Sequence, residues 1–195
     1  MSAPAQRDLE ARIAQSLDSG DLHAAATVAV RGYGPQILGY LVTVTHDEEL
    51  AHEVFSQFCE ALWRGIGRYR RECAMRTWAY KIAWTLSKDA QRAAFRRRER
   101  RLETTEFSKL ADEVRSSLPA FQKSEVVDRL HKLRAELDPA EQTLLTLRID
   151  KGMAWKDVAR VFADDEDMGE AALRKRFERL KSKLRRLAAD EGLLR

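Results

Sequence analysis

The sequence has 195 residues, of which 44% are apolar and 34% are charged, and its net charge is +4. No apolar run approaches the roughly 18–20 residues that a membrane-spanning helix needs, and the N-terminus lacks the apolar core of a signal peptide. We therefore expect a cytoplasmic protein without membrane insertion. Two cysteines are too few for a disulfide scaffold and match no zinc-site spacing. Only four prolines and nine glycines, with abundant Ala, Leu, Arg and Glu, favour an all-α fold.

Basic residues are concentrated in two parts of the chain. Arginines dominate residues 92–101, lysines and arginines dominate residues 174–186, and the segment between them is mildly acidic. This distribution predicts two contacts with a polyanion such as nucleic acid. We expect two small helical domains, residues 1–102 and 124–195. A linker over residues 103–123 would join them, because its periodicity is weak and it contains Ser-Ser-Leu-Pro.

The first predicted helical region runs from about residue 8 to residue 44. Turn-forming residues predict two interruptions, near residues 19–21 and near residues 32–35. The second interruption would place Pro35 in the first turn of a new helix, where proline is well tolerated.

Thr45 or Asp47 can cap the next helix, which we expect over residues 48–63. Its apolar positions share one face, and its acidic and polar positions share the other. The acidic face is either simply solvated or a docking surface for a basic protein partner. A strongly basic loop without periodicity then follows over residues 64–73.

The helix predicted over residues 77–100 has two different faces. At 100° per residue, one arc is assigned to the core by three apolar side chains: Trp78, Ile82 and Leu86. Tyr80 and Trp84 point to the other side, among lysines and arginines. Rings interleaved with cations are typical of a platform on which unpaired bases stack while the cations hold phosphates. The alternative is that this second face is buried against a neighbouring helix.

The C-terminal part begins with a strong helix signal at Asp138, followed by Pro139 and Glu141. Gly152 is expected to end this helix. A short helix, a polar turn and a basic helix over about residues 170–189 come next. The basic helix has a narrow apolar stripe (Leu173, Phe177, Leu180, Leu184 and Leu187) and is otherwise covered by cations. This order favours a helix-turn-helix whose last helix enters a DNA major groove, over a coiled coil, a membrane-surface helix or a solvated face.

Catalytic sites are not indicated. Glu49 and His52 form one Glu-x-x-His step, but a di-iron bundle needs a second such step and further glutamates. The sequence has no glycine-rich phosphate-binding loop and no nucleophile elbow. We therefore expect neither an enzyme nor a metal site.

Together these segments resemble the bacterial RNA polymerase sigma factors of the sigma-70 family, in the small two-domain extracytoplasmic-function (ECF) group. The resemblance covers about residues 33–101 and 138–187. HEVFSQFCEALW, RYRRECAM and RTWAYKIA are similar to the family's acidic helix, basic loop and Arg-Thr-Trp-x-Tyr-x-Ile-Ala pattern. LDPAEQTLLTLRIDKGMAWKDVARVF looks like the start of the family's promoter-binding domain.

The resemblance implies a promoter-specificity subunit without a cofactor, since catalysis belongs to the polymerase core. Residues 1–102 would be a region 2-like domain that binds core polymerase and the −10 element. Residues 124–195 would be a region 4-like helix-turn-helix domain that binds the −35 element. The implied partners are the β and β′ subunits of core RNA polymerase and promoter DNA, with an anti-sigma factor as a further partner to consider.

The resemblance also assigns residues to each contact. The core-polymerase residues would be Glu49, His52, Glu53, Phe55 and Gln57. The −10 or single-strand residues would be Arg68, Tyr69, Arg70, Arg71, Arg76, Trp78, Tyr80, Lys81, Trp84, Lys88 and Arg92. The −35 residues would be Arg174, Lys175, Arg176, Arg179, Lys181 and Lys183.

One departure from the family pattern concerns the turn over residues 163–169, which is longer than usual and strongly acidic. Its acids would repel phosphates if they faced DNA, so we consider that they face the polymerase or a regulator instead. Two alternative functions remain open. One is a stand-alone helix-turn-helix regulator, and the other is a helical polymerase-binding adaptor that does not contact DNA.

Overall fold

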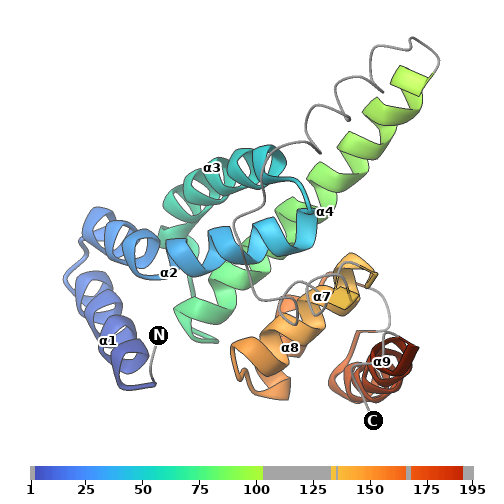
Figure 1. The fold of residues 1–195 in the computed structure, drawn as a ribbon. Coiled ribbons are helices and arrows are strands. Elements are labelled where there is room, and N and C mark those ends of the chain that lie inside the picture. The colour runs from blue at the N-terminus through green and yellow to red at the C-terminus, as the bar shows by residue number, and fades with distance from the viewer. Residues whose placement is uncertain (1–2, 103–132, 135, 166–167, 191–195) are drawn as a thin grey trace, which may run out of the picture.

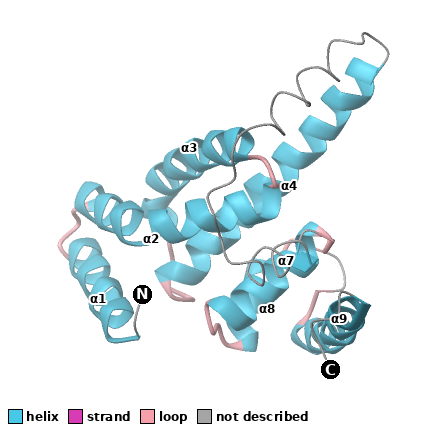
Figure 2. Cartoon of the chain, in the orientation of Figure 1, coloured by secondary structure: helices cyan, strands magenta, loops and turns pink. Residues whose placement is uncertain are grey.

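The structure is a computed structural model that describes residues 3–102, 133–134, 136–165 and 168–190. Every regular element in these ranges is helical, and none of these residues lies in a strand (Figure 2), so the predicted all-α fold is confirmed. The predicted linker over residues 103–123 lies outside the described residues, as does the start of the second predicted domain.

The N-terminal half contains α1 (Ala3–Asp18), α2 (Leu22–Thr45), α3 (Glu48–Gly65), the short η1 (Ile66–Arg68) and α4 (Met75–Leu102). The expected break between the first two helices is confirmed. Gly20 adopts a left-handed φ of 77°, and the Asp21 side chain accepts a hydrogen bond from the Ala24 amide to cap α2.

The second expected break is wrong, because α2 continues through Pro35. Proline inside a helix removes one hydrogen bond, which normally favours a break. Here Pro35 lies on the exposed side, while Tyr33, Gly34 and Ile37 around it are fully buried. Packing on both sides of the proline therefore holds the helix together.

The predicted amphipathic character of α3 is confirmed. The Asp47 side chain accepts from the Leu50 amide at 3.0 Å and caps the helix. The buried side of α3 consists of Ala51, Val54, Phe58 and Leu62. Its acidic positions face outward, as the sequence pattern requires.

The start of α4 is held by a residue of α1. One carboxylate oxygen of Glu10 accepts from the Met75 amide at 2.9 Å, and the other accepts from the Arg76 amide at 3.0 Å. The second oxygen also accepts from the hydroxyl of the buried Tyr33. Glu10 thus satisfies helix N–H groups that would otherwise lack partners.

The C-terminal half contains α7 (Pro139–Leu145), which continues into the π-helical turn η2 (Thr146–Asp150), then α8 (Trp155–Val161) and α9 (Glu170–Asp190). The predicted capping box is present, because Asp138 accepts from the Glu141 amide and Glu141 accepts from the Asp138 amide. Gly152, with φ of 60°, forms the turn before α8. The predicted order of a helix, a glycine turn, a short helix and a basic helix is therefore confirmed.

The two halves pack against each other (Figure 1). The orange α8 lies along the middle of the green α4, and α7 lies against α2. Buried apolar side chains of both halves form one continuous core. This arrangement buries the face of α4 that carries Tyr80 and Trp84. The sequence analysis left open whether an unpaired strand or a neighbouring helix covers that face.

Candidate polymerase and nucleic-acid interfaces

The exposed face of α3 carries most of the residues expected to bind core polymerase. Glu49, His52, Glu53 and Gln57 are all exposed. Phe55 is only half-exposed, and its ring stacks on that of Phe58 with centroids 5.8 Å apart. The structure therefore places four of the five on an open acidic and polar surface, with the phenylalanine at its border.

The basic loop before α4 is only partly open to solvent. Arg68, Arg70 and Arg71 are all exposed, but Arg71 adopts a left-handed φ of 58° and binds Asp18 of α1 at 2.7 Å. The ring of Tyr69 stacks on Trp78, with centroids 5.2 Å apart and planes at 29°. The hydroxyl of Tyr69 donates to the Cys73 carbonyl, and burial raises the pKa of this phenol.

Trp78 therefore lies where the helical angle had placed it, toward the protein. It is half-buried and packs against the core and against Gly65, where an added Cβ would lie 3.2 Å from the indole ring. Two rings of the predicted single-strand set are thus already stacked on each other. Ile82 and Leu86, assigned to the core with Trp78, are likewise partly buried against it.

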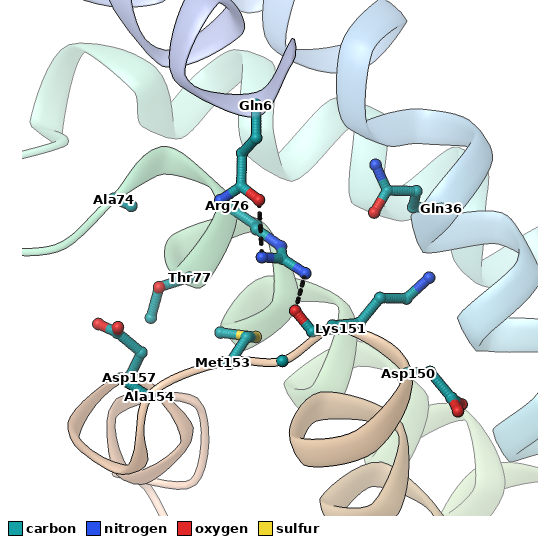
Figure 3. A pocket seen from close by; sticks show the side chains of 11 residues that line it. Gln6, Gln36, Ala74, Arg76, Thr77, Asp150, Lys151, Met153, Ala154 and Asp157 are labelled. Atoms are coloured by element: carbon teal, nitrogen blue, oxygen red, sulfur yellow. Dashed lines mark hydrogen bonds between the residues drawn. The ribbon is translucent and has the colours of Figure 1, made fainter. Parts of the chain in front are cut away.

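Arg76 joins the two halves (Figure 3). Its guanidinium donates to the Gln6 side chain at 2.8 Å and to the Lys151 carbonyl at 2.7 Å. A cavity of about 420 Å³ opens here between α1, α2 and α4 on one side and the η2–α8 segment on the other. Burial is the main cause that lowers the pKa of Lys151 at this cavity.

The second face of α4 is the main correction to the sequence analysis. Tyr80 and Trp84, expected to be open for an unpaired strand, are 1% and 3% exposed. Phe162 and Asp165, which follow α8, contact Trp84, whereas the Tyr80 ring meets that of Tyr40 on α2 edge-on at 5.4 Å. The alternative of burial against neighbouring helices therefore holds in this structure. Burial raises the pKa of the Tyr80 phenol, whose oxygen has no hydrogen-bond partner among the described residues.

Two acids of the C-terminal half bind this face directly. The Trp84 indole N–H donates to Asp165 at 2.6 Å, and the Lys88 ammonium donates to the other oxygen of the same carboxylate. Lys81 pairs with Asp164 at 3.0 Å. Arg92, one turn beyond Lys88, is exposed and at 3.9 Å from Asp89.

The stripe predicted on α9 is confirmed at Leu173, Phe177 and Leu180, which are buried, and at Leu184, which is partly buried. The cations expected to bind the −35 element divide into two groups. The paired ones are Arg174 with Glu170, Arg176 with Asp138, Lys181 with Glu178 and Lys183 with Glu141. Lys175 and Arg179 are exposed and make no ion pair with any described residue.

Aromatic and cation–π contacts of Trp155 fix the start of α8 relative to α9. The Trp155 ring meets Phe177 edge-on at 5.5 Å and lies under the guanidinium of Arg148 at 4.4 Å and that of Arg174 at 5.4 Å. Ala154 is the N-cap residue of α8 and makes no side-chain cap bond. Packing of Trp155 thus takes the place of a polar cap.

Other kinds of site receive no support from the described residues. They contain no group of three His, Cys, Asp or Glu side chains that could hold a metal ion. Burial raises the pKa of both cysteine thiols, Cys59 and Cys73. Within the same part of the chain, no helix combines the length and apolar character needed to cross a membrane.

Sequence reasoning missed the role of several residues. It noted the acidic turn but not that Asp164 and Asp165 bind α4, and it gave Glu10 and Phe162 no role. The acidic turn and the cationic face of α4 carry opposite charges, and this was a signal that Asp165 could bind there. Glu10 offered none, because its partners lie more than 20 residues away.

Comparison with known proteins identifies the N-terminal half of the chain. Residues 29–101, which run from α2 to α4, match the family model described as Sigma-70 region 2. Over 161 residues the chain is 26% identical to the RNA polymerase sigma-H factor of Pseudomonas aeruginosa, covering 80% of this chain and 83% of that protein. Residues 29–101 therefore belong to the sigma-70 region 2 family.

The region 2 match and the similarity to a sigma factor support a role in transcription initiation for a chain that is not itself an enzyme. Its length of 195 residues is consistent with the ECF group of this family. The matched segment contains the acidic face of α3, the basic loop and α4. These are the elements that carry two of the three predicted contacts of a sigma factor.

Proposed function

We propose that this protein is a sigma-70 family member that binds core RNA polymerase through its β and β′ subunits, directs it to specific promoters and helps to melt the −10 region. The observation that carries the proposal is the match of residues 29–101 to sigma-70 region 2. That segment holds an exposed acidic helix beside a basic loop and an aromatic helix. We place its site of action in the cytoplasm, with the polymerase.

The core-binding contact is proposed on α3. Glu49, His52, Glu53 and Gln57 present acceptors on a rigid helix, and the opposite side of that helix is anchored in the core. A fixed acidic face suits a basic partner surface, because the helix is already ordered before the partner binds and no ordering cost reduces the affinity. Phe55 would add an apolar contact at its border.

The −10 contact is proposed on the basic loop and on α4. Arg68 and Arg70 are open, and Arg92 continues the positive surface along α4. The remaining proposed residues divide into two groups. Tyr69, Arg71 and Trp78 contact one another or other residues of the N-terminal half. Arg76, Tyr80, Lys81, Trp84 and Lys88 are buried or bonded to the second half. Because Phe162 and Asp165 of the second half cover Trp84, single-strand binding at that ring requires the halves to separate.

The −35 contact is proposed on α9, in the helix-turn-helix domain that the sequence predicts over residues 124–195. Lys175 and Arg179 point to solvent and are free for phosphates or base edges. Arg174, Arg176, Lys181 and Lys183 are bound to acids of the same half, so DNA would have to compete for them. We therefore propose that the two open cations, Lys175 and Arg179, make the first contacts with duplex DNA.

The test is reconstitution with bacterial core polymerase and a genomic promoter library. We expect a holoenzyme that initiates at a defined subset of promoters. Glu53→Lys on α3 should weaken core binding, whereas Asp8→Lys makes the same charge change on the exposed side of α1 and should not. A folded chain that forms no holoenzyme would refute the proposal.

Two other outcomes would support the alternatives. Tight, sequence-specific binding to duplex DNA without polymerase would indicate a stand-alone regulator. Core binding with no promoter selectivity, and no effect of Lys175→Ala or Arg179→Ala, would indicate an adaptor.

A further inference from the structure

The cavity beside Arg76 is formed by segments that are far apart in the sequence (Figure 3). Its walls come from α1, α2 and the start of α4, and from η2, the start of α8 and the segment between them. Its volume of about 420 Å³ falls in the range, roughly 300–1,000 Å³, of pockets that hold small organic ligands. A single monatomic ion would leave most of this space empty.

Two cations, one from each half, line the cavity without an ion pair to any described residue. The Arg76 guanidinium donates to two neutral oxygens, the Gln6 side-chain amide at 2.8 Å and the Lys151 carbonyl at 2.7 Å. Its Nε–H is buried and has no hydrogen-bond partner in the described structure. The Lys151 ammonium makes no hydrogen bond with a described residue, and Figure 3 shows it pointing toward Gln36. Donors of both cations are therefore left for a ligand.

The acids around the cavity are occupied elsewhere. Both carboxylate oxygens of Asp150 bind the Arg134 guanidinium, each at 2.9 Å. Asp157 lies 3.6 Å from Arg160. Glu10, at the start of α4, uses its two oxygens on two backbone amides and on the hydroxyl of a buried tyrosine. None of these acids is within ion-pair distance of the two cavity cations, so the positive charge of the cavity is not neutralised by contact.

The environment of Lys151 also favours an anion. Burial is the main cause that lowers the pKa of this ammonium, and the positive charge of Arg76 lowers it further, while Asp150 raises it. A partly buried cation without a partner loses hydration that a bound oxyanion would replace with charged hydrogen bonds. The planar fork of an arginine matches two oxygens of a phosphate group, and a lysine binds such a group as a point charge.

We propose that this cavity binds a small anion that carries a diphosphate group, with one phosphate at the guanidinium of Arg76 and the other at the ammonium of Lys151. Two phosphate groups are assigned because the two cations come from different halves and the space exceeds that of one ion. The amide nitrogen of Gln6 would add a neutral donor. The inference goes beyond the proposed function, since this ligand is neither polymerase nor promoter DNA.

The test is calorimetric titration of the full-length chain with sodium pyrophosphate, in about 0.15 M potassium chloride so that exposed charges are screened. Lys151→Gln removes one cavity charge, and Lys156→Gln removes the same charge from an exposed position on α8. We expect affinity to fall at least about tenfold in Lys151→Gln and to stay within about twofold in the control. Lys151→Arg keeps the charge and should bind within about threefold of wild type, which separates loss of charge from a disturbed fold.

The place of binding needs its own measurement, because the exposed cations of α9 could also attract pyrophosphate. Amide chemical shifts of the ¹⁵N-labelled chain report it by NMR. The largest changes should occur at Arg76, Gly152 and Met153, which line the cavity. Amides near Lys175 and Arg179 should respond to pyrophosphate no more than to sulfate at equal ionic strength.

A parallel titration with adenosine diphosphate distinguishes two sources of the diphosphate group. Affinity above that of pyrophosphate would assign the remaining space to a nucleoside, and equal or lower affinity would assign the site to the inorganic anion. Either result supports the site, provided that the affinity falls in Lys151→Gln.

Three results would overturn the proposal. The first is unchanged pyrophosphate affinity in Lys151→Gln, or no binding by the wild-type chain at millimolar pyrophosphate. The second is a set of shift changes centred on Lys175 and Arg179. The third is a short single-stranded oligonucleotide whose affinity depends on Lys151 as strongly as that of pyrophosphate, since the ligand would then be a nucleic-acid backbone. None of these results bears on promoter selection, which reconstitution with core polymerase tests separately.

Discussion

Glu10 is expected to be a main stabilising residue of the N-terminal half, although it lies outside the segment that matches the family. Its carboxylate binds the Met75 and Arg76 amides and the Tyr33 hydroxyl. In Glu10→Ala, the start of α4 loses its cap, which costs about 1 kcal/mol. The Tyr33 hydroxyl is fully buried, so leaving it without a partner costs roughly 1–3 kcal/mol more.

The sum predicts that Glu10→Ala lowers the free energy of unfolding by about 2–4 kcal/mol. For a chain of this size, that loss corresponds to a melting temperature lower by roughly 5–15 °C. Urea denaturation followed by circular dichroism measures the first quantity, and a thermal scan measures the second. Asp8→Ala, an exposed acid on the same helix, should change the free energy by less than about 0.5 kcal/mol.

A double-mutant cycle with Tyr33→Phe tests the reason for the loss. Removing the hydroxyl also removes the unpaired group that Glu10→Ala creates. Glu10→Ala combined with Tyr33→Phe should therefore cost about 1–2 kcal/mol less than the sum of the two single changes. Additive effects within about 0.5 kcal/mol would show that the bond between these residues contributes nothing, and the reasoning from the buried hydroxyl would fail.

Further predictions concern backbone conformation and an unpaired hydroxyl. Gly152→Ala should destabilise the protein by about 1–2 kcal/mol, because alanine is strained at a φ of 60° although there is open space for its Cβ. Gly39→Ala, with similar space inside α2, should instead stabilise it by about 0.5–1 kcal/mol. Urea denaturation measures both changes, and shifts of the same sign would contradict the reasoning that the backbone φ decides between them. Tyr80→Phe removes a buried hydroxyl without a described partner and should raise the free energy of unfolding by about 1 kcal/mol, so a clear loss would reveal a hidden partner.

Features encoded by neighbouring residues could be predicted from the sequence. The capping box of Asp138 and Glu141, the Asp47 cap and the Gly152 turn all depend on groups a few residues apart. Pro35 shows the limit of such reasoning. Its local preference was for a break, and the buried residues around it on α2 outweighed that preference.

The site on α4 could be predicted only in part. Helical angles correctly separated Trp78 from Tyr80 and Trp84, and they placed lysines beside the second pair. They could not tell whether a ligand or a neighbouring helix covers that side, because the covering residues lie about 80 positions further along the chain. The same non-local dependence hid Glu10, whose importance arises from amides that no periodicity connects with it.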